Sequence, residues 1–175
     1  MAIVPDDKDW TWVLVERCPE CGFDASDLDP AAVAPLVRDC ARDWATLHAE
    51  GGITATRPDP ATWSPLEYAC HVRDVFLRFD ARTASMLDTD DPLFENWDQD
   101  ATAVEDRYAE QDPDAVVPAL VAAAAAMAAR LDAVTDDQWE RPGRRSNGSV
   151  FTVDTLARYM IHDPIHHLWD VSGRP

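Results

Sequence analysis

His162 and His166 stand four positions apart near the end of the sequence. On a helix this spacing places both rings on one face, one turn apart, which suits two ligands of one metal ion. Neutral imidazole is a good ligand for zinc and nickel. Two surface or capping histidines would give the same spacing, but the neighbouring residues favour a buried site because many are apolar: Met160, Ile161, Ile165, Leu168 and Trp169.

His71 lies in another predicted helix, one that begins with a capping box formed by Ser64 and Glu67 around Pro65. Glu67 and Asp74, about one turn before and after His71, could orient its imidazole through hydrogen bonds. Three histidines from two helices, with a fourth position open, is the arrangement of a catalytic zinc site. Taken alone, His71 could equally be a core histidine bonded to a carbonyl or a carboxylate.

Two further residues on the last predicted helix could support such a site. His167 is adjacent to His166 but about 100° around the helix, so we expect it to orient a ligand or to pack against the helix of His71. Asp170, one turn beyond His166, could orient that imidazole. Pro164 removes a backbone hydrogen bond between the paired histidines and is expected to kink the helix. His48 is expected to be an ordinary histidine near a helix C-terminus.

Three segments resemble the DinB/YfiT-like metalloenzyme superfamily. They are WSPLEYACH at 63–71, FENWD at 94–98 and HDPIHHLWD at 162–170. The resemblance extends over roughly residues 44–171. It implies that His71, His162 and His166 bind one divalent ion, with zinc as the first expectation and nickel as the second. It also implies an all-α, four-helix bundle of DinB/YfiT-like type.

The resemblance also implies a reaction. Family members with a characterised activity use a low-molecular-weight thiol, as mycothiol-dependent maleylpyruvate isomerases and bacillithiol or mycothiol S-transferases. We therefore expect a metal-dependent S-transferase in which a metal-bound thiolate attacks an electrophile, so that the protein supplies no nucleophile of its own. Mycothiol is the expected thiol, because a composition with one lysine and much alanine, aspartate, arginine and valine suggests a GC-rich genome.

Three alternatives remain open for the same residues. One is a thiol-dependent isomerase, and another is a metal-dependent hydrolase in which bound water is the nucleophile. The third is a non-catalytic helical module that a metal stabilises, which would show a closed shell of four ligands and no adjacent pocket. Candidate pocket residues are aromatic or cationic, although ordinary core packing or a solvated surface also explains each of them: Trp63, Phe94, Trp97, Tyr159, Trp169, Arg144 and Arg145. The two arginines could meet an anionic cosubstrate.

Cys18 and Cys21 have the spacing of a metal-binding or redox pair. A structural zinc site needs a second pair of ligands, and Cys40 and Cys70 are isolated in the sequence. No βαβ pattern surrounds the pair, which argues against a thioredoxin-like role. We therefore expect Cys18 and Cys21 to be small packing residues in a reducing cytoplasm, without disulfides.

The charge balance excludes several classes of partner. The 175 residues include 33 acidic and 15 basic residues, which give a formal net charge of −18. Phosphate backbones and anionic membrane surfaces would be repelled. No apolar run reaches the roughly 20 residues of a membrane span, and the acidic N-terminus does not resemble a signal peptide. The expected partners are therefore a small-molecule thiol and an electrophile, in a cytoplasmic protein that could form a homodimer.

The helical pattern predicts a single domain over residues 1–175. An N-terminal lead segment at 1–29 precedes helices expected at 29–49, 64–87, 113–133 and 152–171. Apolar positions recur at helical spacing in these stretches, and no run of strict alternation predicts a strand. The acidic stretch 88–112 is expected to be a long loop near the mouth of the site. A second loop is expected at 135–149.

Overall fold

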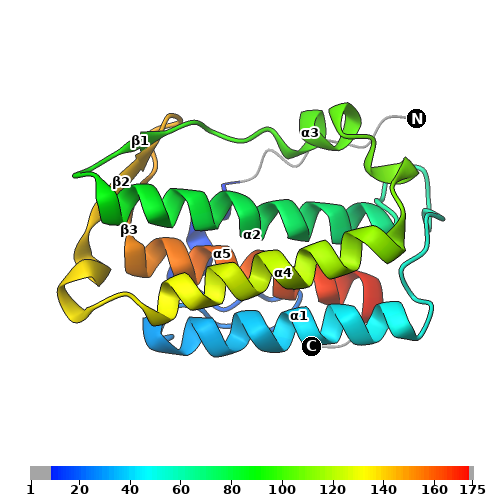
Figure 1. Cartoon of the computed structure of the whole chain (residues 1–175), viewed down its shortest axis with the longest axis horizontal. Coiled ribbons are helices and arrows are strands. Elements are labelled where there is room, and N and C mark those ends of the chain that lie inside the picture. Colours follow the sequence, from blue (N-terminus) through cyan, green and yellow to red (C-terminus); the bar gives the residue numbers. More distant parts are fainter. Residues whose placement is uncertain (1–8, 174–175) are drawn as a thin grey trace.

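Four long helices form the body of the protein, and the computed structural model describes residues 9–173. The helices are α1 (Val33–Ala49), α2 (Pro65–Asp88), α4 (Pro113–Asp132) and α5 (Val153–Ser172). Figure 1 shows them side by side along the longest axis of the molecule. The predicted all-α, four-helix bundle is confirmed.

The bundle does not follow a simple up-and-down order. Both α4 and α5 pack against α1 and α2, so α1 and α2 lie across the bundle from each other although they are consecutive long helices. In Figure 1, α1 and α5 run in one direction and α2 and α4 run in the opposite direction. This arrangement places α5 between α1 and α2, and α5 carries most of the histidines.

Local capping explains where the helices begin. Ser64 caps α2 in a reciprocal box, in which its hydroxyl accepts from the Glu67 N–H at 3.2 Å and the Glu67 carboxylate accepts from the Ser64 N–H at 2.8 Å. Thr152 caps α5 by accepting from the Thr155 N–H at 3.2 Å. Asp29 caps a short 3₁₀ turn, η2 (Pro30–Ala32), that leads into α1. These three start signals are read correctly from the sequence.

The core lies between the four long helices, each of which contributes large side chains that are almost fully buried, including Trp44, Phe76, Met127 and Met160. By length and composition alone α4 could cross a membrane, a test that a core helix also passes. Here its buried residues, such as Leu120 and Ala124, belong to the bundle core.

The two predicted loops contain regular structure. The first holds β1 (Leu93–Phe94), α3 (Gln99–Glu105) and η3 (Tyr108–Glu110), and the second holds η4 (Asp136–Glu140) and β2 (Pro142–Arg145), with β3 (Val150–Thr152) directly after it. In the three-stranded sheet, β1 is parallel to β2 and β2 is antiparallel to β3. The expectation of no strands was therefore wrong, because strands of two to four residues are too short to show an alternating pattern.

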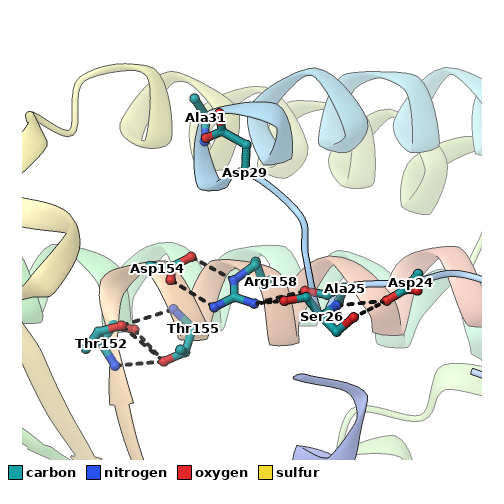
Figure 2. Close-up of polar contacts among 9 residues, drawn as sticks. All are labelled: Asp24, Ala25, Ser26, Asp29, Ala31, Thr152, Asp154, Thr155 and Arg158. Atoms are coloured by element: carbon teal, nitrogen blue, oxygen red, sulfur yellow. Dashed lines mark hydrogen bonds and ion pairs between the residues drawn. The ribbon is translucent and has the colours of Figure 1, made fainter. Parts of the chain in front are cut away.

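The N-terminal segment is fixed along α5. Its 3₁₀ helix η1 (Trp10–Leu14) packs on α5. Figure 2 shows the Arg158 guanidinium between the Asp154 carboxylate and the backbone of the segment. Arg158 donates to the carbonyl oxygens of Ala25 and Ser26 at 3.0 and 2.9 Å. This segment therefore forms an additional layer against the helix of the predicted metal ligands.

Candidate metal centres and the adjoining cavity

The structure divides the predicted metal ligands between two clusters. His71 groups with Asp163 and His167, which we call the histidine–carboxylate cluster. The cysteine–histidine cluster consists of Cys18, Cys21, His162 and His166. In each cluster the potential ligand atoms lie within 4.8 Å of one another, among the residues that the structure describes.

The predicted trio of His71, His162 and His166 is therefore not assembled, and the reason is helical geometry. Successive residues on a helix point about 100° apart, so positions 162 and 166 form one stripe on α5 and positions 163 and 167 form the next. His71 on α2 meets the second stripe. The residues of α5 that meet His71 are therefore offset by one position from the predicted pair.

The histidine–carboxylate cluster has the dimensions of a site for one divalent ion. His71 Nε2 lies 3.2 Å from Asp163 Oδ1, and His167 Nε2 lies 3.8 Å from the same oxygen. Ligands at about 2.1 Å from an ion in tetrahedral geometry are about 3.4 Å apart. Burial raises the pKa of Asp163, but His71 and His167 outweigh burial and hold this pKa well below its usual range. The donors are therefore two imidazole nitrogens and an ionised carboxylate, which suit a divalent ion such as zinc.

Neighbouring side chains fix the two imidazoles of this cluster. The His71 ring is fully buried and stacks on Trp97, with ring centroids 5.1 Å apart and planes at 10°. His71 Nδ1 has no hydrogen-bond partner in the described part of the chain. Asp170 Oδ2 lies 2.8 Å from His167 Nδ1, which favours a proton on that nitrogen and leaves the Nε2 lone pair facing Asp163.

Of the residues predicted to orient the histidines, Asp170 contacts a histidine of the clusters, whereas Glu67 and Asp74 bond to other groups. Glu67 is bonded to Arg57 and to the Ser64 N–H, and Asp74 to Arg73 and Tyr108. The expectation that these two carboxylates orient His71 was therefore wrong, because helix capping and nearby cations occupy them. Asp170 does contact His166, at 3.8 Å, but lies closer to His167. His167 itself, expected to support a ligand, stands among the candidate ligands.

A cavity of about 760 Å³ adjoins both clusters. Its lining includes Asp163 and His167, and four of the predicted pocket residues: Trp63, Trp97, Tyr159 and Arg145. The other three predicted pocket residues are not part of the lining. Phe94 packs under the Arg82 guanidinium, Trp169 packs against the His166 ring, and Arg144 pairs with Asp91 near the surface.

Sequence reasoning missed a cationic group in the cavity wall. Arg82 on α2 is almost fully buried and donates to the Glu95 carbonyl at 2.8 Å. Burial, together with nearby Arg145 and Arg78, lowers the pKa of Arg82 to about 10, so it stays charged at neutral pH. Arg145 lies over the Phe151 and Tyr159 rings. In the described part of the chain neither Arg82 nor Arg145 pairs with a carboxylate, which is unusual in so acidic a protein.

The cysteine–histidine cluster is more enclosed. Cys18 Sγ lies 3.6 Å from His166 Nδ1, and Cys21 Sγ lies 3.8 Å from His162 Nε2. All four residues are buried, and both cysteines are free. Burial and the neighbouring His166 lower the pKa of His162 to about 4, so its ring is neutral at neutral pH. The cysteines do pack the lead segment as expected, but they also face two histidines across the interface with α5.

The two cysteines could have been linked to the histidines from the sequence. A Cys-x₂-Cys pair and a His-x₃-His pair are the two halves of a Cys₂His₂ zinc site. The prediction that Cys18 and Cys21 are packing residues took only Cys40 and Cys70 as possible partners and left the histidine pair out. Asp163 was also missed as a ligand. Asp163 and His167 have the same four-residue spacing as His162 and His166, but the pair of histidines is the more familiar metal-binding motif.

Comparisons with known proteins agree with this architecture. A family model described as the DinB superfamily matches residues 27–171. A similar solved structure is YfiT from Bacillus subtilis, described as a probable metal-dependent hydrolase with an unusual four-helix bundle topology. The two chains are 16% identical with a TM-score of 0.68, over 98% of this chain and 91% of YfiT. At this identity the likeness concerns the fold. No curated protein sequence matches the chain.

Proposed function

Because the chain belongs to the DinB superfamily, we propose that it is a divalent-metal-dependent S-transferase whose ion, zinc in the first instance, is held by His71, Asp163 and His167. The observation that carries this proposal is that two of these donors, Asp163 and His167, line a cavity of about 760 Å³, with His71 buried directly behind them. Three protein ligands beside a cavity leave a coordination position for a substrate, as catalytic sites require.

An ion in this position would lower the pKa of a thiol that binds it, so that a thiolate is available near neutral pH. The protein's own residues hold the geometry. Trp97 stacks on the His71 ring, and Asp170 lies 2.8 Å from His167 Nδ1, which favours the tautomer whose Nε2 faces the cluster. These contacts support a site organised before the substrate binds.

The cavity wall suggests the substrate chemistry. Arg82 and Arg145 supply guanidinium groups that suit a carboxylate or phosphate on the electrophile. Uncharged polar side chains on the wall, Asn96, Gln99, Asn147 and Ser149, suit a hydrophilic thiol such as mycothiol. In the proposed reaction the thiol S–H bond breaks and its proton goes to water, the sulfur forms a bond to an electrophilic carbon of an anionic substrate, and that carbon releases its leaving group as an anion.

A metal-dependent hydrolase is the second candidate. Two histidines and one carboxylate are the donors of several hydrolytic zinc enzymes, and YfiT is described as a probable hydrolase. The nucleophile would then be water, and an added thiol would compete for the open position. A thiol-dependent isomerase would need the same thiol but would not consume it.

Thiol consumption tests the proposal. Zinc-loaded protein is mixed with mycothiol and a bimane electrophile, and thioether formation is followed by fluorescence. At pH 6.5 a free thiol with a pKa of about 8.5 is only about 1% ionised, so acceleration by the loaded protein should be greatest at or below this pH. Asp163→Asn should remove the acceleration, and His48→Ala should keep it. No acceleration with any thiol, together with ester or amide hydrolysis that mycothiol inhibits, would favour the hydrolase.

A further inference from the structure

We propose that Cys18, Cys21, His162 and His166 form a closed structural zinc site that fastens the N-terminal segment to α5. This site is distinct from the histidine–carboxylate cluster and does not depend on the proposed S-transferase activity. It uses one pair of ligands from each side of the interface.

The distances between the donors fit tetrahedral zinc. With Zn–S at about 2.3 Å and Zn–N at about 2.05 Å, a tetrahedral angle separates sulfur from nitrogen by about 3.6 Å. The two measured separations are 3.6 Å, between Cys18 Sγ and His166 Nδ1, and 3.8 Å, between Cys21 Sγ and His162 Nε2. All four ligand atoms lie within 4.8 Å of one another. Two independent thiol–imidazole hydrogen bonds would not require this convergence.

The backbone around the cysteines forms a tight turn that suits a metal. The Gly22 N–H donates to the Cys18 carbonyl at 2.9 Å, and the Cys18 N–H donates to the Phe23 carbonyl at 2.9 Å. Gly22 has a φ of 75°, in the left-handed region that favours glycine. The turn brings both sulfur atoms to the same side of the segment, facing α5.

The cluster is almost completely buried and has four potential ligands, which favours a structural over a catalytic role, although His162 and His166 also line the cavity. Its four residues are 1–6% exposed. The rings of Trp10, Trp12 and Phe23 pack around His162, with centroids 5.6 to 6.5 Å away. Structural zinc sites have four protein ligands and no open position, and this cluster supplies all four.

A carboxylate orients one of the proposed ligands. Glu20, inside the cysteine turn, places Oε2 3.4 Å from His166 Nε2. A proton on Nε2 leaves the Nδ1 lone pair directed at Cys18, which is the tautomer that coordination requires. The segment that donates two sulfurs therefore also supplies the group that orients an imidazole from α5.

The proposed zinc would also stabilise the wall of the cavity. Trp10 and Glu20 of the N-terminal segment line this cavity. Asp163 and His167 each directly follow a proposed zinc ligand on α5. Fixing His162 and His166 would therefore fix the stretch of α5 that carries the other cluster.

Metal content and cobalt spectroscopy test this site without any activity assay. Full-length protein, purified under reducing conditions and saturated with zinc, is expected to retain two ions per chain after desalting. Cys18→Ser and Cys21→Ser should each retain one, and Cys40→Ser, which changes a buried cysteine outside the cluster, should retain two. Cobalt-substituted wild-type protein should show a sulfur-to-cobalt charge-transfer band, which Cys21→Ser weakens and His71→Ala leaves unchanged.

Two further measurements test the site even if the serine variants fail to fold. Cys21→His keeps a zinc ligand and should retain the ion with a weaker charge-transfer band. In the wild type, a mercurial reagent should release one zinc as it modifies Cys18 and Cys21. The proposal is overturned if cobalt-loaded wild-type protein lacks the band, if Cys21→Ser retains both ions, or if the two cysteines form a disulfide under reducing conditions. Failure of the S-transferase assay would leave these results unaffected.

Discussion

The histidine–carboxylate cluster and the cysteine–histidine cluster use adjacent stripes of the same helix in different ways. All four residues line the cavity, but Asp163 and His167 group with His71 of α2, whereas His162 and His166 group with the cysteines of the N-terminal segment and are surrounded by aromatic rings. One cluster has three donors, two of which are only partly buried, and the other has four donors that are all buried. On the proposed assignments, a one-residue shift along α5 separates a reactive metal position from a structural one.

The largest expected effect is the loss of activity in His71→Ala. If the histidine–carboxylate cluster holds the catalytic ion, removing this ligand should cost several kcal/mol of transition-state stabilisation, or roughly a thousandfold in kcat/KM. The cysteine–histidine cluster should keep its zinc, so metal content should fall from two ions to one. Transfer kinetics and elemental analysis on the same sample measure both effects.

His48→Ala is the matched control, because His48 lies at the end of α1 and belongs to neither cluster. It should retain both ions and full activity. If His71→Ala remained active while Cys21→Ser lost all activity in a folded protein, the roles assigned to the two clusters would be reversed.

Arg145→Gln should weaken binding of an anionic electrophile. A hydrogen bond to a charged group contributes about 1.5–3 kcal/mol, so KM should rise roughly 10- to 150-fold. Arg145 belongs to neither cluster, so Arg145→Gln should not change the metal content. The KM of an uncharged electrophile should change little in this variant. Steady-state kinetics with a matched pair of charged and neutral bimanes would measure this. An equal loss for both electrophiles would indicate that Arg145 maintains the fold of the cavity wall instead.

Asp170→Asn and Glu20→Gln each remove one carboxylate beside a histidine of a different cluster, so they should affect zinc binding at different clusters. Asp170 lies 2.8 Å from His167 Nδ1, and Glu20 lies 3.4 Å from His166 Nε2. Loss of such a partner typically costs about 10- to 100-fold in metal affinity or activity. Asp170→Asn should therefore reduce zinc affinity mainly at the histidine–carboxylate cluster, and Glu20→Gln only at the other one. Competition with a chromophoric chelator measures both affinities, and identical profiles for the two variants would contradict the assignment.

The fold could be predicted from the sequence because its strongest signals are local. The capping boxes of α2 and α5 and the helical apolar periodicity depend on residues within a few positions of each other. The short sheet could not be predicted, since β1 and β2 pair across about 50 residues of sequence and neither strand is long enough to show a pattern. The order of the helices around the core depends on packing between distant segments.

The segments that form the candidate site could be predicted from the sequence, but the residues of α5 that face His71 could not. The sequence identified the segments of α2 and α5 that carry the donors, yet it did not indicate which stripe of α5 faces α2. Glu67 illustrates the same limit, because its spacing from His71 suggested a contact that Arg57 and Ser64 prevent by occupying its carboxylate. Arg82 carries no motif at all, and only the packing of α2 against the sheet region brings it to the cavity.

The smallest expected effect concerns Glu67, which lies one turn from His71 but belongs to neither cluster. Burial raises its pKa, but hydrogen bonds from Arg57 and Ser64 outweigh burial, so the net pKa lies below its usual value. A carboxylate with a lowered pKa in the folded state stabilises the protein above its unfolded pKa of about 4.3 and loses this contribution as pH falls through the folded value. Glu67→Gln should therefore lower Tm at pH 7, by roughly 2–4 °C if the capping contribution is about 1 kcal/mol. The difference in Tm from the wild type should shrink toward pH 3, and metal content at pH 7 should stay at two ions. Loss of an ion in this variant at neutral pH would mean that Glu67 supports His71 after all.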